Sequence, residues 1–135
     1  MKTAWFPSHE ACEVVEVEFL TLSGESHRRK LLVDSGFTGQ SNMILGADET
    51  GLIWAMMDPA QASGALHGAQ DRAWVTCRIS EIGFQKAAIA ILTDLGPLSL
   101  PDGIAGMVGL SFLRQFERWG AEQSPDGWRF CLAFE

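Results

Sequence analysis

The spacing of apolar residues constrains the fold of this chain more than any other feature of its sequence. Most apolar segments are short and alternate with polar residues, as in "EVVEVEF" (Glu13–Phe19) and "WVTCRIS" (Trp74–Ser80). A period of two is typical of half-buried β-strands. Turn residues such as "SGES" (Ser23–Ser26) separate these segments and predict a hairpin. We therefore expect an all-β or mainly β fold.

The remaining segments fit this fold. Only "GLSFLRQFERW" (Gly109–Trp119) has helical spacing, so we expect one short helix there. Asp58 and Pro59 should end the apolar segment before them. Further strands are expected at Arg28–Val33, Asn42–Leu45, Leu52–Met57, Phe84–Leu92 and Gly127–Phe134.

Length and charge set limits on function. The 135 residues suit a single domain, 1–135, with a core of its own. A formal net charge of -7 argues against a nucleic-acid partner, because phosphates would be repelled. No apolar stretch approaches the roughly 20 residues that cross a bilayer, and the start of the chain lacks the apolar block of a signal peptide.

Cysteine usage points to a reducing compartment. Cys12, Cys77 and Cys131 are odd in number and scattered, which suits free thiols in a cytoplasmic protein. His9 and Cys12 could share a metal, but no second pair supports them. We therefore interpret Cys12 as a small core or surface thiol and predict no metal and no cofactor.

The stretch "KLLVDSGFTGQSNMIL" (Lys30–Leu45) ends an apolar run on a carboxylate, Asp34. Taken alone, Asp34 could be a turn or cap residue that bonds local amides. A second segment, "GIAGMVGLSFLRQF", contains Met107-Val108-Gly109 ahead of the expected helix. Together, in this order and on a β-rich chain, the two segments resemble the retropepsin-like aspartic proteases, including single-domain bacterial members. The resemblance covers about Val14 to Phe134.

The resemblance implies a closed β fold with one lobe per chain and Asp34 as the catalytic residue. Two carboxylates within a few ångströms cannot both ionise, so they share one proton and act as base and acid. Gly36 leaves room for substrate backbone. Ser35 has a hydroxyl that could bond across a symmetric interface and steady the carboxylates.

The number of such motifs decides the assembly. The chain contains a single Asp-Ser-Gly, so the second aspartate must come from another copy across a twofold axis. We therefore expect a homodimer with its site at the interface. The apolar ends "AWFP" (Ala4–Pro7) and "RFCLAF" (Arg129–Phe134) are expected to pair across that axis.

The Gly-rich "ASGALHG" stretch fits the hairpin, or flap, that covers bound peptide in this family. Its substrate-binding residues would be Gly64, Ala65, Leu66, His67 and Gly68. The alternative is a plain surface hairpin loop. His67 departs from the apolar flap tip that the family would suggest, and the chain has no Tyr to steady a flap.

The sequence thus predicts an aspartic endopeptidase acting on peptide or protein substrates. One alternative is an inactive dimer of the same fold that serves as a peptide-binding or assembly module. A second is an aspartyl-phosphate enzyme, which also places a nucleophilic Asp after an apolar strand. That chemistry needs Mg²⁺ and alternating strands and helices, so we rank it low, and insensitivity to chelators would separate it from the protease.

Overall fold

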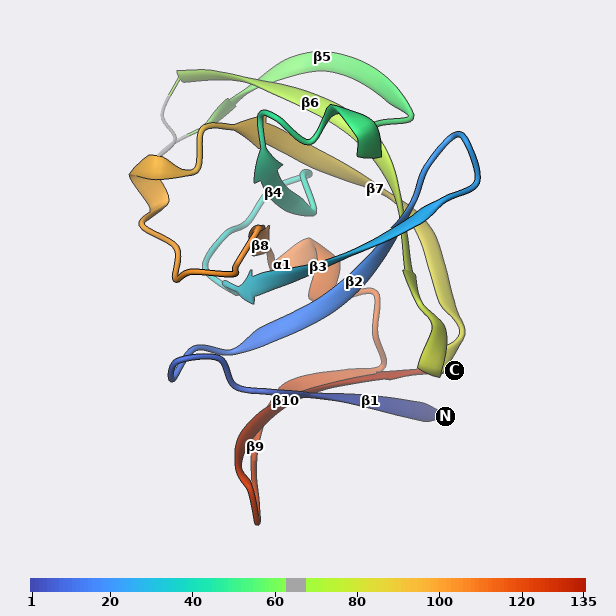
Figure 1. Cartoon of the computed structure of the whole chain (residues 1–135), viewed down its shortest axis with the longest axis vertical. Coiled ribbons are helices and arrows are strands. Elements are labelled where there is room, and N and C mark those ends of the chain that lie inside the picture. The colour runs from blue at the N-terminus through green and yellow to red at the C-terminus, as the bar shows by residue number, and fades with distance from the viewer. Residues whose placement is uncertain (63–67) are drawn as a thin grey trace.

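The computed structural model describes residues 1–62 and 68–135 and shows a mainly β fold (Figure 1). Apolar alternation predicted this class correctly. Within the described residues, no helix is long and apolar enough to cross a membrane. In chain order the elements are β1 (Lys2–Pro7), β2 (Val14–Leu20), β3 (Ser26–Val33), β4 (Met43–Gly46), η1 (Thr50–Leu52), β5 (Ala55–Ala62), β6 (Gly68–Ile79), η3 (Ser80–Ile82), β7 (Phe84–Thr93), η4 (Gly96–Leu98), β8 (Gly106–Val108), α1 (Leu110–Leu113), β9 (Arg118–Ser124) and β10 (Gly127–Phe134).

Six strands close into a barrel in the order β2–β3–β8–β4–β7–β6. Strands β2 and β6 complete it through an antiparallel pairing from Glu18–Arg78 to Leu20–Thr76. Strand β5 pairs with the first part of β6 and forms the edge of the sheet. The barrel interior is packed with fully buried side chains, of which the largest include Phe19, Phe84, Phe112, Leu31, Met43 and Leu45.

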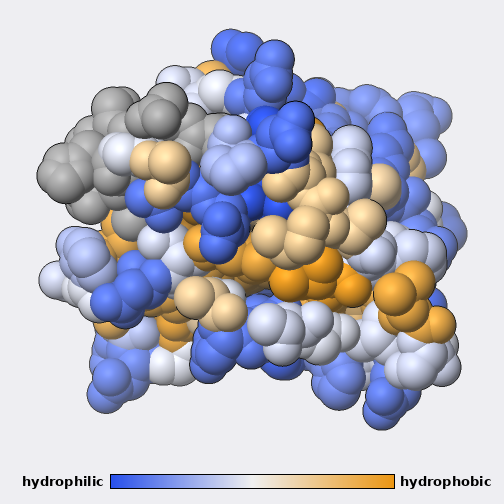
Figure 2. Space-filling view, turned by 90° about the horizontal axis from the view of Figure 1, so that it is seen from above, coloured by the Kyte–Doolittle hydropathy of each residue, from blue (hydrophilic) through white to orange (hydrophobic). Residues whose placement is uncertain are grey.

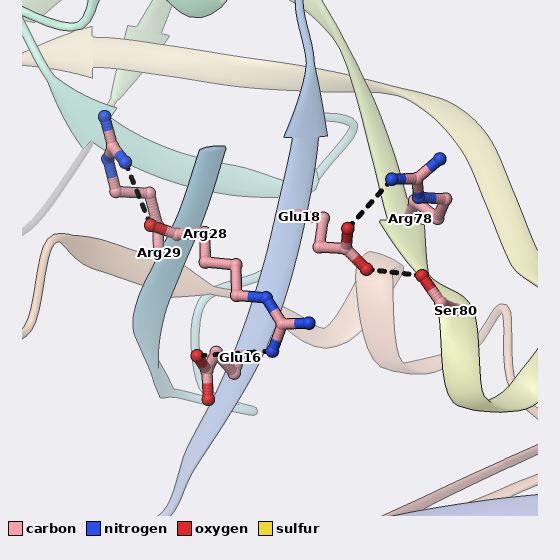
Figure 3. A network of polar contacts seen from close by, with 6 residues as sticks. All are labelled: Glu16, Glu18, Arg28, Arg29, Arg78 and Ser80. Carbon is pink, nitrogen blue, oxygen red and sulfur yellow. Dashed lines mark hydrogen bonds and ion pairs between the residues drawn. The ribbon is translucent and has the colours of Figure 1, made fainter. Parts of the chain in front are cut away.

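A charged network lies on the closing pair of strands (Figure 3). The Glu18 carboxylate is buried and accepts hydrogen bonds from the Ser80 hydroxyl, at 2.5 Å, and from Arg78 Nη2, at 2.9 Å. The pKa of Glu18 lies below its ordinary value. The hydrogen bond from Ser80 is the largest cause, and the hydrogen bond from Arg78 is the second. The neighbouring Arg28–Glu16 pair is longer, at 3.9 Å, and exposed. Barrel closure therefore includes an ionised, hydrogen-bonded carboxylate.

The two ends of the chain form a separate three-stranded antiparallel sheet in the order β1–β10–β9. The β9–β10 hairpin extends away from the barrel (Figure 1). Ala4, Phe6, Phe130 and Leu132 are buried in the main core. The apolar ends that the sequence suggested would pair across a dimer axis thus pair with each other within one chain, and Trp5 remains 50% exposed.

Of the segment predicted to be a helix, Gly109–Trp119, only Leu110–Leu113 is helical, and its last two residues are strand. Helix α1 ends at Leu113, and β9 begins at Arg118. Strand β9 forms a continuous antiparallel ladder with β10, and these long-range hydrogen bonds outweigh a weak local helical pattern. Strand β5 also continues through Asp58–Pro59, with a register shift, because an edge strand tolerates proline.

The three cysteines are free thiols. Cys77 lies in the barrel core, and burial raises the pKa of its thiol to about 12. The Cys131 thiol donates a hydrogen bond to Gly120 O at 3.2 Å, and burial is the main cause that raises its pKa. Both thiols therefore stay protonated near neutral pH.

Candidate active site

Asp34 stands at the end of β3, where the chain leaves the barrel. Strand β3 pairs in parallel with β8, which places Val33 opposite Val108. The Asp34 N–H extends this pairing by donating to Val108 O at 3.0 Å. The backbone of the candidate catalytic residue is therefore fixed by the second of the two sequence motifs.

A tight turn then orients the Asp34 carboxylate. The Gly36 N–H donates to Asp34 Oδ1 at 2.9 Å, and the Phe37 N–H donates to Asp34 O at 3.1 Å. A Cβ added at Gly36 would lie only 3.2 Å from Oδ1, which favours glycine at this position. Within the described part of the chain, Asp34 Oδ2 and the exposed Ser35 hydroxyl make no hydrogen bond. One carboxylate oxygen is oriented while the other is open to a ligand, as a general base requires.

The loop after Asp34 crosses over Gly109. Leu110 N–H donates to Phe37 O at 2.9 Å, and Gly109 N–H donates to Asn42 O at 2.9 Å. A Cβ on Gly109 would lie 2.5 Å from Phe37 Cδ2 and 2.6 Å from Phe37 O. At these distances Phe37 or Gly109 would have to move. Glycine at position 109 therefore permits the crossing that brings the two sequence motifs together.

Two polar residues that the sequence did not single out anchor this loop. Asn42 Oδ1 accepts a hydrogen bond from Ile89 N–H at 2.8 Å, and its Nδ2 donates to Ser111 Oγ at 3.1 Å. The Ser111 hydroxyl donates in turn to Ser41 O at 3.1 Å. These bonds link the loop to β7 and α1. Their partners are distant in the chain, so no local sequence pattern indicates them.

An apolar surface lies beside the carboxylate. Leu32, two residues before Asp34 on the same side of β3, packs against a small cluster on the outside of the barrel. Figure 2, seen from the side of β5 and β6, also shows a band of apolar surface between hydrophilic side chains. Leu32 and Phe37, which flank the Asp34 turn in the chain, are half-buried, so this part of the cluster reaches the surface. The cluster consists of Ile44, Ile91 and Met107, with Leu32, Phe37, Leu95, Leu98 and Leu100 packed on it.

The predicted flap falls mostly outside the described residues. Of its five residues, Gly64, Ala65, Leu66 and His67 belong to the undescribed segment 63–67. Gly68 is described: it begins β6 opposite Ala62, is exposed and has a φ of 97°, which favours glycine. The hairpin arms β5 and β6 flank that segment, and Trp54, Met56 and Trp74 on or beside these arms are exposed.

Among the described residues, no group of three or more His, Cys, Asp or Glu side chains comes together to hold a metal ion. His9 and Cys12 pair through their backbones, and His9 Nε2 contacts Asp102 O at 2.8 Å.

No protein-family model, curated protein or solved structure matches the chain.

Proposed function

We propose that the chain is an aspartic endopeptidase of retropepsin-like fold, active as a homodimer in which each copy contributes Asp34. The observation that carries the proposal is the setting of this carboxylate at the end of β3. One oxygen is held by Gly36, the backbone is held by Val108, and the adjoining loop crosses over Gly109.

In the proposed reaction, two Asp34 carboxylates share one proton. The ionised carboxylate removes a proton from a water molecule as the oxygen of that water attacks the peptide carbonyl carbon. The protonated carboxyl donates its proton to the carbonyl oxygen, giving a tetrahedral intermediate. Collapse of the intermediate breaks the C–N bond, and the departing nitrogen takes up a proton. Because one carboxylate must be ionised and the other protonated, cleavage should pass through a maximum as the pH is varied.

The exposure of the Asp34 turn supports assembly around it. Ser35 and Gly36 are exposed, so a second copy can approach both carboxylates. The Ser35 hydroxyl, which makes no hydrogen bond to any described residue, is available to bond across the axis. The half-buried Leu32 and Phe37 of the apolar cluster support a substrate with apolar side chains beside the cleaved bond.

The proposal is tested by incubating a diverse peptide library with the wild type and with Asp34→Asn. We expect Asp34→Asn to fold normally and to lose roughly 10²- to 10⁴-fold in cleavage rate, because the amide cannot share the proton. Asp94→Asn is the matched control: Asp94 Oδ1 also accepts a hydrogen bond from a glycine two residues on, Gly96, at 3.0 Å. That variant should cleave like the wild type.

Excess Asp34→Asn chains added to the wild type should lower its activity through inactive heterodimers. Undiminished cleavage by pure Asp34→Asn would remove the catalytic assignment. Peptide binding by the wild type without cleavage would favour the alternative, a peptide-binding module. A strictly monomeric species with full activity would rule out a shared pair of aspartates.

A further inference from the structure

Strand β9 is an unprotected edge of the terminal sheet. Within the described residues no strand pairs with its outer side. Natural edge strands are often protected by proline, a bulge or charged side chains. Strand β9 has no proline, pairs with β10 without a register shift, and carries two charged residues of opposite sign, Arg118 and Glu122. The opposite edge, β1, ends in Pro7 and lies close to β2 and η3. Trp119 on β9 is 38% exposed. The open, regular edge is therefore on β9.

The register shows which backbone groups point outward from β9. Ser8 N–H donates to Trp128 O, so Trp128 and every second residue after it direct their N–H and C=O groups toward β1. The residues between them, such as Cys131, direct theirs toward their partners on β9, such as Gly120. By the same alternation, Trp119, Ala121 and Gln123 direct their N–H and C=O groups away from the sheet. The edge is ready to accept another strand.

The side chains of β9 are complementary to a second copy of β9. In an antiparallel pair with Gly120 at the twofold axis, Arg118 lies opposite Glu122 of the partner subunit. In the same register, Trp119 lies opposite Ala121 of the partner subunit, and these are the residues with outward N–H and C=O groups. One register therefore satisfies main-chain hydrogen bonds and charges together.

Both charged groups have capacity for this contact. Among the described residues Arg118 makes no ion pair. Glu122 Oε1 accepts bonds from Trp5 Nε1 at 2.9 Å and from Arg129 Nε at 2.7 Å, while its Oε2 makes none in the described part of the chain. Glu122 is thus positioned by its own chain and still presents a free oxygen.

We propose that β9 is the surface through which two copies of this chain meet, joining their terminal sheets into one six-stranded sheet. This inference rests on the proposed function, because it names a contact surface for the homodimer proposed there. It assigns the contact to β9 rather than to the chain ends, which are already paired within each copy.

The test is sedimentation equilibrium on chains that all carry Asp34→Asn, so that cleavage plays no part. Arg118→Glu places like charges opposite each other and should raise the dimer Kd at least about tenfold. Ala121→Pro removes an outward N–H without removing a bond to β10 and should leave the chain monomeric. Arg114→Glu makes the same charge change on the exposed end of α1 and should leave the Kd unchanged.

Crosslinking fixes the register independently. Gly120→Cys, made together with Cys131→Ala to remove the adjacent thiol, should form a disulfide-linked dimer, since residues opposite each other at such a site lie about 4.5 Å apart. Ala121→Cys should crosslink poorly, because this register separates the two copies of residue 121. Efficient crosslinking at 121 instead of 120 would overturn the register.

If the dimer Kd is unchanged by Arg118→Glu and also by Ala121→Pro in a folded protein, the β9 interface is overturned. The shared aspartate would survive that result, because the heterodimer experiment tests it separately. A wild type that is monomeric and inactive at all concentrations would overturn both proposals. If Ala121→Pro fails to fold by circular dichroism, Arg118→Glu and the crosslink decide the question.

Discussion

Replacing Glu18 with glutamine should destabilise the barrel by about 1–3 kcal/mol at neutral pH. Glu18 lies directly opposite Arg78 in the short β2–β6 pairing that closes the barrel (Figure 3). The substitution keeps the size of the side chain and removes its charge. It therefore isolates the contribution of the ionised carboxylate.

The magnitude follows from the surroundings of the two charges. The Glu18 side chain is 11% exposed, and hydrogen bonds to buried charged groups contribute about 1.5–3 kcal/mol. Loss of one partner from a fully buried pair costs about 3–5 kcal/mol, but the Arg78 side chain is 34% exposed and keeps water when its partner is lost. The Ser80 hydroxyl can still donate to the amide oxygen. The expected loss is therefore below that of a fully buried pair.

Urea unfolding of the wild type and Glu18→Gln across a range of pH measures the effect. Because folding lowers the pKa of Glu18, its contribution is present above the ordinary carboxyl pKa and is lost as the pH falls through the folded value. The two proteins should therefore converge in acid. Glu16→Gln is the control: its side chain is 44% exposed, its pair with Arg28 is long, and it should cost below about 0.5 kcal/mol. An equal loss at neutral and acid pH would refute the reasoning.

Two further substitutions test backbone positions. Gly109→Ala should lower the free energy of unfolding by about 1–3 kcal/mol and reduce peptide cleavage, because its Cβ would force Phe37 and the Asp34 loop to move; an unchanged midpoint of urea unfolding would contradict the crossing. Ala11→Gly should stabilise the chain by about 0.5–1 kcal/mol, because Ala11 has a φ of 63° in the turn between His9 and Cys12. Ala87→Gly, at an exposed strand position, should destabilise it by a similar amount in the same assay.

Sequence patterning predicted the strands whose two faces differ. The strand expected at Gly127–Phe134 is β10 with the same bounds, and the hairpin around Ser23–Ser26 joins β2 to β3. In β10 the buried Phe130 alternates with the half-buried Arg129 and Cys131, and β2 alternates valine with glutamate, so the period of two is visible in the sequence. No such alternation indicated β8, a three-residue strand that is wholly buried.

Some residues of the candidate site could be predicted from the sequence and others could not. Asp34 and Gly109 could be singled out because each stands in a recognisable local motif. Asn42 and Ser111 could not, because their roles arise from hydrogen bonds between segments far apart in the chain. The two chain ends pair with each other within one copy through hydrogen bonds between residues far apart in the sequence. Their apolar composition alone does not distinguish this pairing from pairing between two copies.

Topology, more than the local turn, distinguishes Asp34. Strands β3 and β4 follow each other in the chain, yet β8 lies between them, parallel to β3 and antiparallel to β4. The segment that joins β3 to β4 must therefore cross the end of β8, and it does so where Gly109 leaves room. Asp94 lies in a similar turn without such a crossing. Its carboxylate also accepts a bond from a glycine two residues later, but Asp94 follows β7 and is exposed. Among the described residues, an Asp carboxylate accepts a bond from a glycine two residues later at both Asp34 and Asp94, and of these two carboxylates the one at the crossing is half-buried.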